Sequence, residues 1–480
     1  MSGKDCLKEN RRCAFGVLVL VRRIFPILTL VICLPAEYSN LGAQAEEVQR
    51  QIDKGLRLGK EGEWARASVE LRKAVQLNPA SAEAHFSLGV ALWWNKELPA
   101  AAEELNAALR IKPQFAEAHY FLGRTLQQSG DLEGAIGHLG EAIRYQPQLA
   151  EPRNSLGVAL QGAGDYGGAI GSLREALRLK PDFPEAQNNL GLALIQSADF
   201  EAAVAEFRKI LDKHPAFLEA RRNLGLAFMN MGDLVSAERT YREILRSEPQ
   251  DTRVNFNLAI VLKQQDKMEE AVKYLRMAIQ YQPDFTEARY ELGVTLWQQG
   301  KLNEAMDKLG CAGSERNRSS KVLFTCGLIL KERGEIEAAV HAFRLSVETQ
   351  PTFPEAHYSL GLVLRQQGKT ETSQQEFKIA ESQRVGQQSL EAATFATQGG
   401  LNRLARGDLE GAVDQFRVAT MRMPGYAPAY FQLSLALEKL GRKEEAARAL
   451  ATAKDLDPGL RLSRSPLGLR GWVQSQMRAR

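Results

Sequence analysis

The sequence predicts an all-α fold, a solenoid in which tandem helical hairpins stack along the chain. Three observations predict it. A spacing of about 34 residues recurs over most of the chain, apolar residues within each unit recur at steps of three and four, and aromatic residues make up only 7% of the composition. Helical periodicity with a thin core of small aliphatic side chains favours stacked hairpins over a thick globular interior.

A glycine, usually preceded by leucine, marks the first helix of each unit. A small residue follows twelve positions later and a large apolar residue four positions after that, as at Ala101 and Leu105. Proline closes most units, where it ends one helix and fits the first turn of the next. Twelve units therefore run from 48 to 460. The marked positions are Gly55, Gly89, Gly123, Gly157, Gly191, Gly225, Ala259, Gly293, Gly327, Gly361, Gly400 and Ser434.

This pattern resembles the tetratricopeptide repeat (TPR), a helix-turn-helix unit of about 34 residues. The resemblance implies a right-handed superhelical α-solenoid of about twelve repeats. Glycine-containing pairs such as Gly130-Asp131 and Gly232-Asp233 are expected to separate the two helices of a unit. We assign repeats one to ten to 48–387, an insertion to 388–392, and repeats eleven and twelve to 393–460. The end of the chain, 461–480, is expected to be a capping helix or a basic tail.

The first 45 residues have the pattern of an export leader. Six lysines and arginines stand there against three acidic residues, an apolar run of eleven residues covers Ile24–Leu34, and the segment ends in Ala43-Gln44-Ala45. This pattern predicts a cleaved signal peptide and an exported protein, periplasmic or secreted. Alternatively, 14–34 inserts as one segment and the leader remains as a membrane anchor. A membrane is an expected partner only in that second case.

Two departures interrupt the repeat. Repeat eight lacks its closing proline, and Cys311 and Cys326 flank the segment that replaces it. These two are the only cysteines after the leader. They predict either two small buried thiols or, in an oxidising compartment, a disulfide across the joint. Around 385–392 a proline is again missing and five residues are inserted, which predicts a lengthened helix before repeats eleven and twelve.

Candidate binding residues lie on the first helices, which line the groove of such a solenoid. Asparagines stand two positions before the marked glycine or alanine in three consecutive repeats, at Asn189, Asn223 and Asn257. They resemble part of the asparagine ladder in the superhelical region of O-linked N-acetylglucosamine transferases. The resemblance implies side-chain amides that pair with the backbone of an extended peptide. The alternative is that these are solvated polar side chains without a ligand.

Arginine and aromatic side chains supply further candidates, because such residues dominate binding hot spots. Arg221 and Arg289 stand four positions before a marked glycine, and Trp297 lies near the end of a first helix. Trp93 and Trp94 are adjacent and cannot both point to one helix face, so one of them is expected to be an exposed anchor. The alternative is that most of these side chains belong to the core between repeats.

No motif in the sequence predicts catalysis, and we expect no cofactor and no metal. The six histidines form no H-E-x-x-H pattern, and no phosphate-binding loop or nucleophile elbow is present. A net charge of +4 over this length offers no dense basic face for nucleic acid. We therefore expect a non-enzymatic scaffold that binds a protein or an extended peptide. With a retained leader, it would be a membrane-anchored assembly factor that organises an envelope complex.

Overall fold

The computed structural model describes residues 36–311 and 319–458 and, within them, contains 23 helices and no strand. The all-α class and the helical pairing predicted from the sequence are thereby confirmed. The predicted leader up to residue 35 and the predicted cap or tail at 461–480 lie outside the described residues.

The described helices belong to two compact units, one formed by residues up to 162 with 167–189, and the other by 163–166 with the residues from 190 on. The first unit contains α2 (Ala36–Glu61), α3 (Trp64–Leu77), α4 (Ala82–Trp94), α5 (Leu98–Ile111), α6 (Ala116–Ser129), α7 (Leu132–Tyr145), α8 (Ala150–Gly162) and nearly all of α9 (Tyr166–Leu179). The next helix, α10 (Pro184–Gln196), crosses the border between the units.

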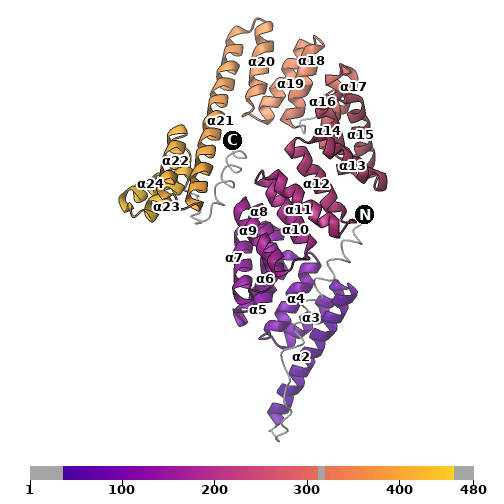
Figure 1. Ribbon diagram of the computed structural model, residues 1–480, viewed down its shortest axis with the longest axis vertical. Coiled ribbons are helices and arrows are strands. Elements are labelled where there is room, and N and C mark those ends of the chain that lie inside the picture. The colour runs from indigo at the N-terminus through magenta and orange to yellow at the C-terminus, as the bar shows by residue number, and fades with distance from the viewer. Residues whose placement is uncertain (1–35, 312–318, 459–480) are drawn as a thin grey trace. The chain divides into compact units, whose positions relative to one another are not determined.

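The second unit is the larger of the two. Its helices are α11 (Phe200–Lys213), α12 (Leu218–Met231), α13 (Leu234–Ser247), α14 (Thr252–Gln264), α15 (Met268–Tyr281), α16 (Thr286–Gln298), α17 (Leu302–Leu309), α18 (Ser320–Glu332), α19 (Ile336–Thr349), α20 (Pro354–Gln366), α21 (Thr370–Ala405), α22 (Leu409–Arg422), α23 (Ala427–Lys439) and α24 (Lys443–Leu456). Consecutive helices such as α18, α19 and α20 lie side by side in antiparallel order (Figure 1).

A contact between a glycine and a large side chain sixteen positions later joins the two helices of a hairpin. A Cβ atom placed on Gly225 would lie 2.5 Å from Cε1 of Tyr241, whose side chain is fully buried. Gly89 meets Leu105 in the same way, at 2.7 Å from its Cγ. The glycine therefore marks the place where a side chain of the second helix occupies the space that a Cβ would need.

The glycine–aspartate pairs separate the helices as predicted. Gly130 ends α6 and Gly232 ends α12 with φ angles of +89° and +83°, in the left-handed region that glycine adopts without a steric cost. The carboxylate of Asp131 then accepts a hydrogen bond from the backbone N–H of Gly134, and Asp233 does the same for Ser236. Each aspartate thus caps the N-terminus of the following helix.

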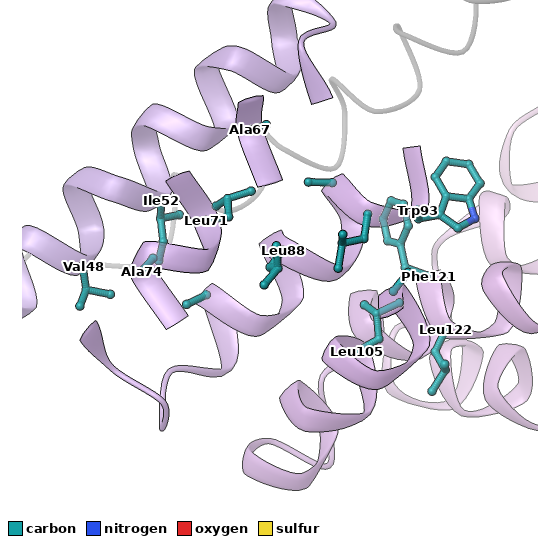
Figure 2. Packing of buried hydrophobic residues seen from close by; sticks show 14 residues of the cluster. Val48, Ile52, Ala67, Leu71, Ala74, Leu88, Trp93, Leu105, Phe121 and Leu122 are labelled. Carbon is teal, nitrogen blue, oxygen red and sulfur yellow. The ribbon is translucent and has the colours of Figure 1, made fainter. Parts of the chain in front are cut away.

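The core of the first unit begins at the predicted start of the repeats. Val48 and Ile52 on α2 are buried, and they pack with Leu71 and Ala74 of α3 and with Leu88 of α4 (Figure 2). Ala43-Gln44-Ala45, the predicted cleavage sequence, lies within α2, ahead of these buried residues. In the described part of the chain, none of the helices has the length and apolar character that crossing a membrane requires.

Both predicted departures from the repeat are visible in the second unit. The helix α17 has 8 residues and ends at Leu309, whereas the equivalent α15 has 14. The predicted lengthened helix is α21, with 36 residues. It includes the second helix of repeat ten, the insertion 388–392 and the first helix of repeat eleven without a break. Val385 stands where the spacing would place a proline, so nothing stops the helix there.

The glycine contact gives a first prediction. Gly225→Ala should lower the midpoint of thermal unfolding, because its methyl group meets the buried ring of Tyr241, and overpacking of this kind costs about 1–3 kcal/mol. Gly137→Ala is the control, since a Cβ on this exposed glycine of α7 meets no atom within 4 Å. That change should stabilise the helix by about 0.5–1 kcal/mol. Circular dichroism melts in which both variants shift alike would contradict the packing register.

Candidate protein-binding surface

The first helices of repeats eight to ten present one face that packing between repeats leaves accessible. Its residues stand three positions before, one after and four after the marked glycine, and we call them the first-helix stripe. In repeats eight to ten none of them is fully buried. The members there are Tyr290, Val294, Trp297, Phe324, Leu328, Lys331, Tyr358, Leu362 and Arg365. Aromatic, aliphatic and cationic side chains in one row form a surface suited to another polypeptide.

The three candidate asparagines each follow directly after the first stripe position of their repeat, and their side chains are half-buried. The Asn189 amide donates a hydrogen bond to Oδ1 of Asn154 in the preceding repeat, at 2.9 Å. Asn257 lies 3.4 Å from the hydroxyl of Tyr241, the buried residue of the preceding hairpin. These amides therefore contribute to contacts within the protein. Peptide binding by Asn189, Asn223 and Asn257 stays a prediction.

The expectation of an exposed tryptophan anchor is wrong. Trp93 is only 3% exposed, and it packs on Phe121 with Arg124 4.3 Å from its ring centre. Trp94 is half-buried and stacks parallel to Trp64, with 5.2 Å between ring centroids. Adjacent side chains point to different faces, but α4 has a neighbouring hairpin on each side, so both faces are covered.

The position four residues before the glycine serves the turn between repeats. Arg221 donates a hydrogen bond to the carbonyl oxygen of Pro215 at 2.6 Å, and Arg289 does the same to Pro283. These arginines hold the chain where one repeat passes into the next, rather than lying in the stripe. Trp297 does lie in the stripe, and its indole N–H donates to Glu332 at 2.6 Å.

Histidines occupy the same turn position in repeats two, three and ten. In each, Nε2 contacts the carbonyl oxygen of the closing proline, and Nδ1 meets a side chain nineteen positions later. That partner is a glutamate for His85 and for His357, at 2.6 Å in both. For His119 it is His138, with 3.0 Å between the two Nδ1 atoms. Because His119 Nε2 donates to Pro113, its Nδ1 accepts a hydrogen bond from His138.

Repeat three is therefore sensitive to protonation. Burial, and secondarily the charge of His119, lowers the pKa of His138, while Asp131 and Glu141 act in the opposite direction. A second proton on this pair would place two cations in contact. The sequence contains the signal for this pair, since His119 and His138 have the spacing of His85 and Glu104, but the sequence analysis did not identify it.

Cys311 and Cys326 are joined by a disulfide in the structure, with 5.6 Å between their Cα atoms. Cys326 is buried on α18, and Cys311 follows the shortened helix α17. The bond thus links two repeats where the second helix of repeat eight ends early. Elsewhere in the described chain, no three histidine, cysteine, aspartate or glutamate side chains gather as metal ligands.

The repeats match the models of a known family over most of this surface. A tetratricopeptide repeat model matches 52–116, 120–182, 154–216, 188–252, 222–284 and 256–310. A TPR repeat model matches 327–368, and a further tetratricopeptide repeat model matches 427–459. The chain is a tetratricopeptide repeat protein. Such repeats are typically non-catalytic scaffolds for protein–protein interaction. The match extends to the repeat and not to the asparagine ladder.

Solved TPR structures are similar to parts of the chain. A tetratricopeptide repeat protein from Parabacteroides merdae is 14% identical over 52% of this chain and 99% of its own, with a TM-score of 0.44. PilF from Pseudomonas aeruginosa is 22% identical over 43% and 94%, with a TM-score of 0.39. YrrB, described as a TPR protein with an unusual peptide-binding site, is 21% identical over 39% and 96%, with a TM-score of 0.33. No curated protein matches the sequence.

The histidine pair gives a second prediction. In the unfolded chain, His138 becomes protonated below about pH 6.5. In the folded chain its lowered pKa keeps it neutral down to a lower pH. The free energy of unfolding should therefore fall as the pH decreases from 6.5 through that pKa. His138→Glu recreates the pair of His85 with Glu104 and should melt at a higher temperature than the wild type at about pH 5.5, with a smaller difference at about pH 7.5. Identical pH dependence in both proteins would contradict this account.

Proposed function

We propose that this TPR protein is an exported scaffold that binds a partner protein, or an extended segment of one, along the first-helix stripe. The observation that carries the proposal is the composition of that stripe, where Tyr290, Trp297 and Lys331 remain partly accessible although the repeats around them are packed. Large rings and cations recognise polypeptide surfaces, and stacked repeats extend such a row over many residues of a ligand.

Export is supported by the leader and by the cysteines. The first 45 residues combine cations, an apolar run and a small-x-small end, as secretory signals do. After cleavage behind Ala45, only Cys311 and Cys326 remain, and these are the two that the structure joins. A bond that closes a sequence separation of 15 residues stabilises by about 3 kcal/mol, and such bonds persist in oxidising compartments.

A second candidate function follows from the same leader. If 14–34 inserts into a bilayer and is not cleaved, the repeats would be held at a membrane, where they would organise an envelope complex. The apolar run of the leader favours this alternative, and Arg22 and Arg23 within the inserted segment disfavour it.

The two candidates make different predictions for protein purified without reductant from the producing cells. An exported, cleaved chain should begin at Glu46, remain in the soluble fraction after lysis and contain no free thiol until it is reduced, when two appear. A retained anchor would leave the leader, with its three additional cysteines, in the membrane fraction. N-terminal sequencing, fractionation and thiol titration distinguish these outcomes. A cytosolic chain with a full leader and free thiols would contradict both.

Binding along the stripe is tested by crosslinking and affinity capture with the full chain as bait. Tyr290→Ala/Trp297→Ala should lose a partner that the wild type captures, because truncating hot-spot aromatics costs about 2 kcal/mol or more each. Asn189→Ala/Asn223→Ala/Asn257→Ala tests the asparagine ladder in parallel. Val235→Ala, at a 76% exposed position on the second helix α13, is the control. Equal capture by all four proteins would contradict binding at either set of residues.

A further inference from the structure

The first-helix stripe becomes a pocket in repeats nine and ten. A pocket of about 830 Å³ lies between α18, α20 and α21. Its lining includes four stripe residues, namely Phe324 of repeat nine with Tyr358, Leu362 and Arg365 of repeat ten. The stripe is therefore hollowed at this point, where it borders the lengthened helix.

Part of the wall opposite these residues exists because α21 is long. The preceding second helix, α19, ends at Thr349, and the position equivalent to Thr349 in the next repeat is Gln383. A second helix of ordinary length would therefore end there. Arg384 and Gln387 lie beyond that point and still line the pocket, since Val385 replaces the closing proline and the helix continues. This part of the pocket wall is thus a local consequence of the uninterrupted helix.

The middle of the pocket is aromatic and accessible. Tyr358 is 54% exposed, and its ring lies 5.4 Å from that of Phe377 on α21. A tyrosine more than half exposed within a concave, apolar site is the kind of residue that an incoming side chain covers. The pocket can therefore receive one bulky apolar side chain between Tyr358, Leu362 and Phe377.

One cation in the pocket has no ionic partner among the described residues. Arg384 is paired with Glu381, whereas the Arg365 guanidinium contacts the ring of Phe377, at 5.5 Å, and forms no ion pair with a described carboxylate. The contrast with repeat seven is informative. There Lys263, at the position of Arg365, pairs at 2.6 Å with Glu291 of the next repeat. The residue of repeat eleven at the position of Glu291 is Gln398, which carries no charge, so Arg365 remains available.

The opposite end of the pocket contains Glu355 together with the Glu381–Arg384 pair, so that it has one carboxylate in excess. Glu355 lies in the first turn of α20 and Arg365 in its last turn, and Glu355 also forms no ion pair within the described chain. Ten residues of helix separate them, which is about 15 Å along the axis. An extended peptide covers this distance in about four or five residues. The two ends therefore match a peptide with opposite charges at that spacing.

We propose that this pocket binds an extended peptide that has an acidic residue, a bulky apolar residue in the middle, and a basic residue four or five positions from the acidic one. The acidic side chain pairs with Arg365, the apolar side chain covers Tyr358, and the basic side chain pairs with Glu355. This inference rests on the proposed function, because it names the ligand class and the repeats that recognise it.

The test is selection of random twelve-residue peptides displayed on phage against the full chain and against Arg365→Glu. The wild type should enrich peptides with the described charge pattern, and Arg365→Glu should enrich peptides with a basic residue in place of the acidic one. A selected peptide should bind Arg365→Glu at least tenfold more weakly, and exchanging its acidic residue for lysine should restore the affinity. Tyr358→Ala should weaken both peptides.

Arg344→Glu is the matched control, since it makes the same charge change on an exposed position of α19 outside the pocket. Circular dichroism establishes that each variant is folded. If the wild type enriches peptides that Arg365→Glu and Tyr358→Ala bind equally well, the pocket is not the site, and binding elsewhere along the stripe stands. If the wild type enriches no peptide, the pocket inference and the proposal of an extended-peptide ligand both fail. Binding of a folded partner protein would then still be tested by the crosslinking experiment.

Discussion

The structure depends on one contact that ten of the twelve repeats share, in which a glycine on the first helix meets a large residue on the second. Gly225 and Tyr241 are the clearest case, because the ring lies where a Cβ would be. This contact sets the distance between the two helices. That distance decides which faces of the first helix are covered, and a row of partly accessible side chains is left beside the covered ones. The binding surface is therefore a consequence of the packing register.

Because the register recurs at a constant spacing, the sequence was sufficient to predict the fold, the glycine–aspartate turns and the long helix at α21. Individual side chains were harder to place. The adjacency of Trp93 and Trp94 predicts an exposed ring only for a helix with one buried face, whereas a hairpin inside a stack has a neighbour on either side. Arg221 resembles a hot-spot residue by type, yet its length lets it reach the carbonyl of Pro215 in the turn. Such partners depend on rotamers and on contacts with the next repeat, which spacing alone does not specify.

Polar contacts between consecutive repeats recur at the stripe positions, although the interacting side chains differ from one repeat to the next. The pairs Lys263–Glu291, Tyr290–Thr325 and Trp297–Glu332 all link a stripe residue to the following first helix. These contacts are half-exposed, so each contributes modestly to stability. They also use up hydrogen-bonding groups that a ligand would otherwise meet. In the regular part of the array, many polar side chains of the stripe are therefore already paired with the next repeat. Side chains that can bind a ligand are expected where this pairing between repeats is absent.

The insertion near repeat eleven changes this surface for a geometric reason. A helix turns by about 100° per residue, so five added residues leave the following face about 140° away from its expected direction. The chain also continues straight where it would otherwise fold back, since Val385 cannot end a helix as proline does. The surface therefore differs here in two ways. Repeat eleven has Gln398 at the position of Glu291, so Arg365 lacks the partner that Lys263 has, and the continued helix adds Arg384 and Gln387 to the wall at the other end of the pocket. In an array of similar units, specificity arises most readily at such an irregularity, because there the surface differs from every other repeat.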